Sequence, residues 1–317
     1  MANIPVSPMG VGKIIRTGFR LYRDRFSTYL PIGAIAGLWS LIPFLVLLPI
    51  PFLLIAWKVS PAIASIPPVI WAALPVWLIL FVFATAKSLT NLALISRLAF
   101  GTLVDSPETP REARSHVMPR MGRFLTTYFL QILLITVGFL GFLILAGITT
   151  FLGGIFLGVL TPPGGTAVNS SPFYSLIYGI LFLLAIIALA VYLAAFIRFI
   201  IGLDLAQVSL AVEDGLTAWG AIKRSEGLVK GNAGRIFTIL FVVGLISLPL
   251  SIVASLVSSL IVNALALEVS RESPFFQSIE SLISLSVSSV FSIVILPLYQ
   301  LVKAAIYYNL RARKEGI

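Results

Sequence analysis

The chain has 317 residues, of which 59% are hydrophobic and only 11% are charged, whereas an ordinary soluble domain carries about 25% charged residues. This composition excludes a soluble globular protein and predicts an integral membrane protein. Lys plus Arg number 22 against 12 Asp plus Glu, and this basic excess lies in short segments between long apolar runs. The charge therefore favours anionic lipid headgroups as partners rather than nucleic acid.

The first segment predicts a basic amphipathic helix over residues 8–26. Ser7 and Pro8 supply an N-cap and a first-turn proline. Such a helix is suited to lie in the headgroup plane of a bilayer, although it could also serve only to set topology and seal the membrane edge. The predicted anionic-lipid face consists of Lys13, Arg16, Arg20 and Arg23, and the predicted apolar face consists of Ile15, Phe19, Tyr22 and Phe26.

Six apolar runs follow, and each exceeds the roughly 20 residues that a helix needs to cross a bilayer. They predict an all-α polytopic membrane protein, a single domain (1–317) with about six transmembrane helices in one bundle. The runs cover Thr28–Trp57, Val69–Phe100, Phe124–Leu160, Phe173–Leu203, Ile236–Leu267 and Phe275–Leu310.

The connections between the runs alternate in charge. Seventeen of the 22 basic residues lie on one side, in the termini, in one set of connections and, for Arg97, at the end of a run, and three lie deeper within the apolar runs. The opposite set holds only Lys58 and Arg271. Because basic loops stay on the cytoplasmic side, we expect both termini to be cytoplasmic in a multi-pass protein of a bacterial inner membrane.

Each basic segment precedes a pair of apolar runs, which divides the chain into three similar units, 8–100, 108–212 and 214–310. A second basic amphipathic segment is expected over Asp214–Val229, and the segment of the middle unit is broken by Pro119. Threefold duplication is one interpretation. The other is that any hairpin protein with this orientation shows basic and then aromatic residues at its boundaries.

Some ionisable residues fall within or at the ends of the apolar runs, and a charge at a helix centre costs about 2.5–3.5 kcal/mol. We expect Asp204 to pair with a cation on another helix, such as Lys87, and Lys303 to reach the headgroups with its long side chain. The residues could form an interhelical ion pair, bind a lipid phosphate or another anion through the excess cations, or line a transport pathway. This candidate charge site comprises Lys87, Arg198, Asp204 and Lys303.

Two pairs of glycines have the spacing that permits close helix contact, Gly33 with Gly37 and Gly154 with Gly158. Catalytic patterns, in contrast, are missing from the sequence. It has one histidine, His116, no cysteine, no phosphate-binding glycine loop and no Gly-x-Ser-x-Gly turn. We therefore expect a non-enzymatic protein without a cofactor or a bound metal.

Three stretches resemble the membrane domain of bacterial glycerophosphoryl diester phosphodiesterases. They are Gly18-Phe-Arg-Leu-Tyr-Arg-Asp-Arg-Phe26, Ala221-Ile-Lys-Arg-Ser-Glu-Gly-Leu-Val-Lys-Gly-Asn232 and Tyr307-Tyr-Asn-Leu-Arg-Ala-Arg-Lys-Glu-Gly316. The chain departs from that pattern at Asn309, where the family has Asp, and at Glu226-Gly227, where it has a Trp-bearing pair. The resemblance implies a stand-alone membrane domain without the family's catalytic barrel, so no catalytic residue is carried over.

The sequence thus predicts a non-enzymatic integral membrane protein that engages anionic lipids or organises a membrane-protein partner. The alternative is a transporter or channel for a small or lipid-like anion, built around Lys87, Arg198 and Asp204. A cavity that reaches the middle of the membrane would favour transport. A packed core with basic grooves at the cytoplasmic edge would favour lipid or partner binding.

Overall fold

A computed structural model describes residues 9–47, 68–160, 172–267, 270–271 and 273–316, and every regular element in these ranges is a helix. Six helices are long and apolar enough to cross a membrane, which confirms the all-α polytopic class. They are α2 (Phe26–Leu47), α4 (Pro68–Leu103), α6 (Met121–Leu160), α7 (Pro172–Asp204), α10 (Ala233–Leu265) and α11 (Pro274–Glu315). The predicted first run continued to Trp57, and residues 48–57 lie outside the described ranges.

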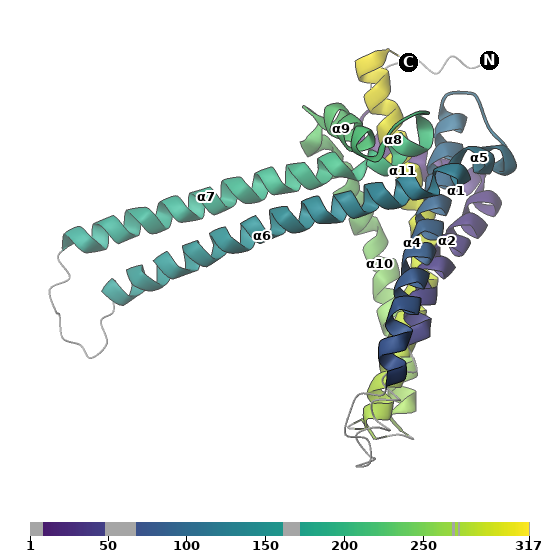
Figure 1. Cartoon of the computed structure of the whole chain (residues 1–317). Helices are drawn as coiled ribbons and strands as arrows, with labels where there is room; N and C mark the ends of the chain where they lie inside the picture. Colours follow the sequence, from purple (N-terminus) through teal and green to yellow (C-terminus); the bar gives the residue numbers. More distant parts are fainter. Residues whose placement is uncertain (1–8, 48–67, 161–171, 268–269, 272, 317) are drawn as a thin grey trace.

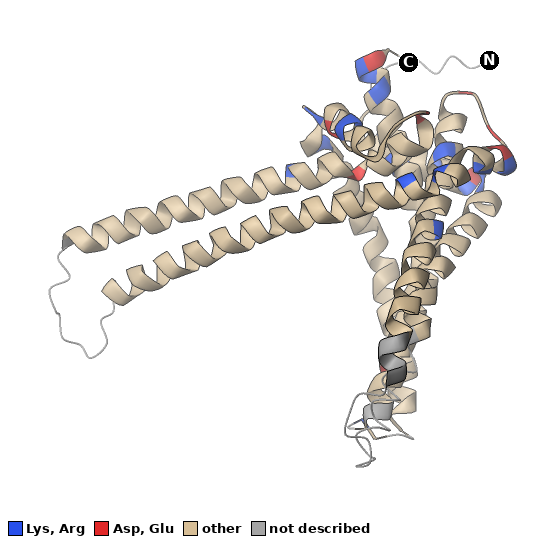
Figure 2. Ribbon diagram, in the orientation of Figure 1, with Lys and Arg blue, Asp and Glu red and all other residues tan. Residues whose placement is uncertain are grey.

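Short helices collect at one end of the molecule. They are α1 (Val11–Asp24), α5 (Pro110–Val117) with the 3-10 turn Met118–Arg120, α8 (Ala206–Val212) and α9 (Ala218–Val229). Both termini lie at this end, and most charged residues gather there (Figures 1 and 2). We call it the basic end. A short helix precedes each of the hairpins α2/α4, α6/α7 and α10/α11, as the three predicted units require, and their duplication stays a prediction.

Local sequence explains where the short helices begin. The hydroxyl of Thr109 accepts a hydrogen bond from the backbone N–H of Glu112, whose carboxylate accepts one from the N–H of Thr109 in return. Pro110 occupies the first turn of α5, where its missing N–H costs nothing. Thr217 caps α9 with a single hydrogen bond, which its hydroxyl accepts from the N–H of Gly220.

Helices α2, α4, α10 and α11 run side by side in a bundle (Figure 1). Gly33 and Gly37 of α2 face α11, where a Cβ on Gly37 would lie 2.7 Å from Cγ1 of Ile293 and one on Gly33 would meet Pro297. The absence of side chains at these two positions therefore lets the backbones approach, as the spacing predicted. Gly154 and Gly158 face open space in the described structure, so the second predicted contact is wrong.

The hairpin α6/α7 forms an arm that leaves the bundle sideways (Figure 1). Glycines of α6 receive aromatic side chains of α7: Gly138 faces Phe196, and Gly153 faces Phe182. Most other side chains of the arm are exposed. The single bundle of six is therefore not observed. The arm has no charge between residues 124 and 197 to bring it to the bundle, and lipid covers such a surface at no cost.

The length of the arm agrees with this sideways course. Helix α6 has 40 residues, which corresponds to about 60 Å at 1.5 Å per residue. A bilayer has a hydrocarbon thickness of about 30 Å, so a helix of this length fits the hydrocarbon only when it is steeply tilted.

The N-terminal helix packs against the bundle. Helix α1 begins at Val11, later than predicted, and Ser7 and Pro8 lie outside the described residues. Gly18 sits on α11, where a Cβ would come within 2.6 Å of Cγ2 of Val302. The Tyr22 hydroxyl donates to the backbone oxygen of Val294 at 2.9 Å. Part of the predicted apolar face of this helix is thus covered by protein.

Candidate functional site

The one acidic member of the predicted charge site is paired with the last helix. The ammonium Nζ of Lys303 on α11 lies 2.6 Å from Oδ1 of Asp204 at the end of α7. The expectation that Asp204 meets Lys87 is therefore wrong. The partner does come from another helix, as predicted. That Lys303 lies at the level of the headgroups stays a prediction. The pair joins the root of the arm to the bundle.

Two glutamines strengthen the root of the arm. The amide Nε2 of Gln131 on α6 donates to the backbone oxygen of Leu203 at 2.6 Å, and Nε2 of Gln207 on α8 donates to Oε1 of Gln131 at 3.2 Å. Sequence reasoning missed both residues. Their signal was a pair of amide side chains at the edges of charge-free runs, where buried polar groups must find partners.

Lys87 stands alone in the middle of α4. Its ammonium lies 5.4 Å from the centre of the Phe83 ring, and within the described ranges it has no ion pair. The half-buried ammonium is therefore held by a cation–π contact on its own helix. The structure does not bring Lys87 together with Arg198 or Asp204.

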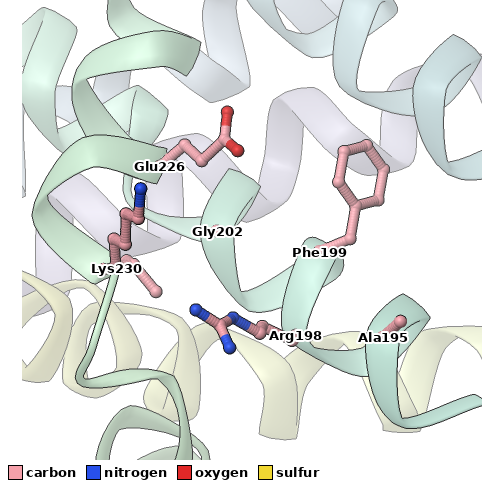
Figure 3. A pocket seen from close by; sticks show the side chains of 7 residues that line it. Ala195, Arg198, Phe199, Gly202, Glu226 and Lys230 are labelled. Carbon is pink, nitrogen blue, oxygen red and sulfur yellow. The ribbon is translucent and has the colours of Figure 1, made fainter. Parts of the chain in front are cut away.

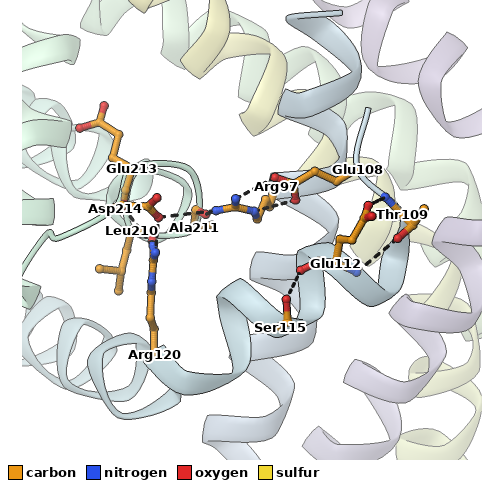
Figure 4. A network of polar contacts seen from close by, with 10 residues as sticks. All are labelled: Arg97, Glu108, Thr109, Glu112, Ser115, Arg120, Leu210, Ala211, Glu213 and Asp214. Carbon is orange, nitrogen blue, oxygen red and sulfur yellow. Dashed lines mark hydrogen bonds and ion pairs between the residues drawn. The ribbon is translucent and has the colours of Figure 1, made fainter. Parts of the chain in front are cut away.

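Four ion-paired residues lock the basic end where α4, α5, α6 and α8 meet (Figure 4). The guanidinium of Arg97 donates to both carboxylate oxygens of Glu108, at 2.8 and 2.7 Å, and to the backbone oxygen of Ala211 at 3.2 Å. Arg120 binds the carboxylate of Asp214. That hydrogen bond, aided by the nearby positive charges, holds the pKa of Asp214 below its ordinary value although burial acts the other way.

A second network fastens the C-terminal end of α11. Arg224 of α9 pairs with Glu213 at 2.8 Å and with Glu315, and Arg311 pairs with Glu315 at 2.8 Å. The Tyr307 hydroxyl donates to Glu213. Burial alone would lower the pKa of Arg224, but its hydrogen bonds to the two carboxylates outweigh burial and raise it. The cation is thus fixed in its charged form.

The three stretches that carry the family resemblance meet in this region. Lys314 donates to the backbone oxygens of Gly227 and Lys230, at 2.6 and 3.1 Å, which joins the C-terminal stretch to the middle one. The side chain of Asn309 accepts a hydrogen bond from the N–H of Met9 at 2.8 Å. Residues from all three stretches, among them Tyr22, Val229 and Tyr307, also belong to one buried apolar cluster, so these motifs contribute to the architecture of the basic end.

A pair of cavities lies at the elbow, where α7 leaves the bundle beside α9 and α10. The first, of about 270 Å³, is lined by Arg198, Glu226 and Lys230 among others. The second, of about 420 Å³, is lined mainly by apolar residues and also by Arg198. We call the two cavities together the elbow pocket. Figure 3 shows Arg198 extending from α7 toward the segment that carries Lys230.

The predicted lipid face of α1 is open to the surroundings. All four of its cations, Lys13, Arg16, Arg20 and Arg23, are exposed, while Ile14 and Leu21 on the other side of the helix are buried. Among the described residues, the ion pairs of Arg20 and Arg23 are with Asp24, at 4.0 and 3.5 Å and in solvent-exposed positions. Exposed pairs of this kind are weak, so the four cations are available to another partner.

The fold and these sites define an integral membrane protein with six apolar helices and a charged, internally paired basic end. No protein-family model, curated protein or solved structure matches the chain. The resemblance to the membrane domain of bacterial glycerophosphoryl diester phosphodiesterases therefore stays a prediction that rests on the three motif stretches. Within the described ranges, no group of three or more His, Asp or Glu side chains could hold a metal ion.

Proposed function

We propose that the chain is a non-enzymatic protein of a bacterial inner membrane, with cytoplasmic termini, that engages anionic lipids at its basic end. The single observation that supports this most strongly is α1. Its apolar side rests on α11, and its four cations face outward without a strong partner. Each basic residue near an anionic membrane surface contributes about 1 kcal/mol of attraction, and this attraction falls off within about 10 Å.

The acidic residues of the basic end support the same function. Glu108, Glu213, Asp214 and Glu315 are each bound by arginines inside the protein, so they do not neutralise the outer face of α1. A packed and internally neutralised core with an exposed basic face is typical of a surface that holds lipid headgroups. The described cavities at the elbow are lined neither by Lys87 nor by the Asp204–Lys303 pair, which favours lipid binding over an anion pathway through those residues.

The test is the selectivity of the reconstituted full chain for spin-labelled lipids. We expect wild-type protein to restrict the motion of phosphatidylglycerol more than that of phosphatidylcholine. At low salt, changing Lys13, Arg16, Arg20 and Arg23 all to Gln should remove most of this selectivity for phosphatidylglycerol. The matched control replaces the three arginines with Lys, which keeps the charge and should keep the selectivity. Equal restriction of the two lipids by wild-type protein would contradict the proposal.

A further inference from the structure

We infer that the elbow pocket binds one phospholipid whose phosphodiester headgroup carries a single negative charge. The phosphate would lie between Arg198 and Lys230, and an acyl chain would follow the apolar cavity between α7 and α10. This inference deepens the proposed function and rests on it for the class of ligand. It differs in that the site is a shaped pocket for one molecule, distant in sequence from the cations of α1.

The charges of the pocket favour an anion, because two exposed cations, Arg198 and Lys230, outnumber one exposed carboxylate, Glu226. In the described part of the chain, the side chains of Arg198, Lys230 and Glu226 have no ion pair or hydrogen bond, whereas Arg224 is paired with both Glu213 and Glu315. Two positive charges and one negative charge leave a net charge of +1, which one phosphodiester neutralises. A doubly charged phosphomonoester would be repelled by the carboxylate of Glu226.

The second cavity indicates a lipid rather than free phosphate. Ile197, Ile201 and Phe237 give it apolar walls, and Arg198 borders both cavities. A ligand that occupies both must be charged at one end and apolar at the other. Most of a small-molecule site is usually apolar, with a few polar groups that fix orientation, and the elbow pocket has this division.

The chain between α9 and α10 leaves room for a lipid to approach the backbone where the second cavity meets Arg198. Gly231 has a φ of 86°, a left-handed conformation that glycine adopts without strain, and neither it nor Gly234 has a neighbour where a Cβ would be. Both glycines line the second cavity. Gly231 precedes the 33-residue helix α10 and Gly234 lies in its first turn, where the N-terminal dipole adds to the attraction for a negative charge.

The position of Arg198 agrees with the level of lipid phosphates. It is the first charged residue after a stretch from 124 to 197 that has none, and it shares a cavity with Lys230 of the basic end. The pocket therefore lies where the apolar arm meets the charged end of the molecule. The phosphates of the bilayer lie at the corresponding boundary between hydrocarbon and water.

The experiment is native mass spectrometry of the full chain in detergent, titrated with phosphatidylglycerol. We expect one tightly bound lipid. Arg198→Gln should weaken its binding about tenfold, which equals about 1.4 kcal/mol, and the further change Lys230→Gln should abolish it. Lys223→Gln is the matched control, because Lys223 is an exposed cation of α9 that contacts Trp219 and does not line the pocket.

A gain of binding makes the result independent of misfolding. Glu226→Gln should bind phosphatidic acid about tenfold more tightly than wild-type protein does, because the repelling carboxylate is gone. Unchanged binding of phosphatidylglycerol by the Arg198→Gln/Lys230→Gln variant would overturn the inference. Displacement of the lipid by millimolar inorganic phosphate would also overturn it, since the site would then take free phosphate.

The proposed function and this inference can fail separately. The variant with four Gln residues on α1 should still retain the single lipid of the elbow pocket. If this variant retains the lipid, but the wild-type protein shows no selectivity between lipids in the bilayer, the proposal for α1 fails and the pocket stands. If the selectivity of α1 is found and the wild-type protein retains no lipid by mass spectrometry, the pocket fails alone.

Discussion

Lys303 and Asp204 form an ion pair that links the last helix of the bundle to the root of the arm, with 2.6 Å between Nζ and Oδ1. They lie 99 residues apart in sequence, and their side chains are only 20% and 25% exposed. Helices of a membrane protein gain little from apolar contact with one another, because lipid tails are as apolar as leucine. A specific polar link is therefore an effective means of fixing where the arm joins the bundle.

Breaking this pair should destabilise the protein, and removing both charges should restore much of the loss. We expect Asp204→Asn to lower the free energy of unfolding by about 3 kcal/mol, because Lys303 is then left uncompensated. Asp204→Asn/Lys303→Met should recover much of it. The measurement is thermal unfolding in detergent. Lys87→Met serves as the control, because Lys87 is not a partner of Asp204. If Lys87→Met lowered the stability as much as Asp204→Asn does, the loss could not be assigned to the Asp204–Lys303 pair.

The contact between α2 and α11 should be sensitive to one methyl group. Gly33→Ala places a Cβ against Pro297 and should destabilise the protein by about 1–3 kcal/mol, as overpacking of a close contact does. Gly154→Ala is the matched control, because that position faces open space and alanine favours a helix. The melting temperature should fall for the first variant and stay or rise for the second. Equal melting temperatures would argue against the close approach of α2 and α11.

The pair of Arg120 and Asp214 predicts a dependence on pH. Because the pKa of Asp214 is lowered in the folded protein, its ionised form adds stability above the ordinary aspartate pKa of about 3.9. This contribution is lost as the pH falls through the lower folded value. The Asp214 side chain is 69% exposed, so Asp214→Asn should cost no more than about 1 kcal/mol at pH 7.

Unfolding curves at several pH values provide the test. The difference in stability between wild-type protein and Asp214→Asn should shrink as the pH is lowered from 5 through about 4 and below. In an Arg120→Gln background the same replacement should have a smaller effect, because the main partner that lowers the pKa is gone and only the weaker influence of Arg97 and His116 is left. A difference that persists unchanged at low pH would contradict this origin.

The predicted orientation can be tested with single cysteines, since the native chain has none. Ser106, between α4 and α5, and Ser270, between α10 and α11, are both exposed. In intact cells an impermeant thiol reagent should label a cysteine at position 270 and not one at position 106; both should react after lysis. Ser225 is unsuitable for this experiment, because it is fully buried and donates a hydrogen bond to Gly202. Labelling at position 106 in intact cells would reverse the assignment of the termini.

Much of the fold was predictable because bilayer thickness is a strong constraint on sequence. Uninterrupted apolar length predicted α6 and α7 to within a few residues, and glycine spacing indicated that Gly33 and Gly37 permit a close helix contact, whose partner α11 only the structure identified. The partner of Asp204 was not predictable in this way. Sequence spacing gives the depth of a side chain along its helix, whereas a salt bridge also depends on how the helix is rotated and which helices are neighbours.

The sequence by itself determined that this is an all-α membrane protein with its cations collected at the ends of apolar helices, because hydrocarbon admits long apolar helices and excludes charge. Only the tertiary structure decided that four helices form the bundle and two form an arm, and that Arg198 and Lys230 line the same cavity at the elbow. Apolar helices are nearly indifferent to whether lipid or protein covers them. Their arrangement therefore depends on a few glycines and polar contacts between residues far apart in the chain.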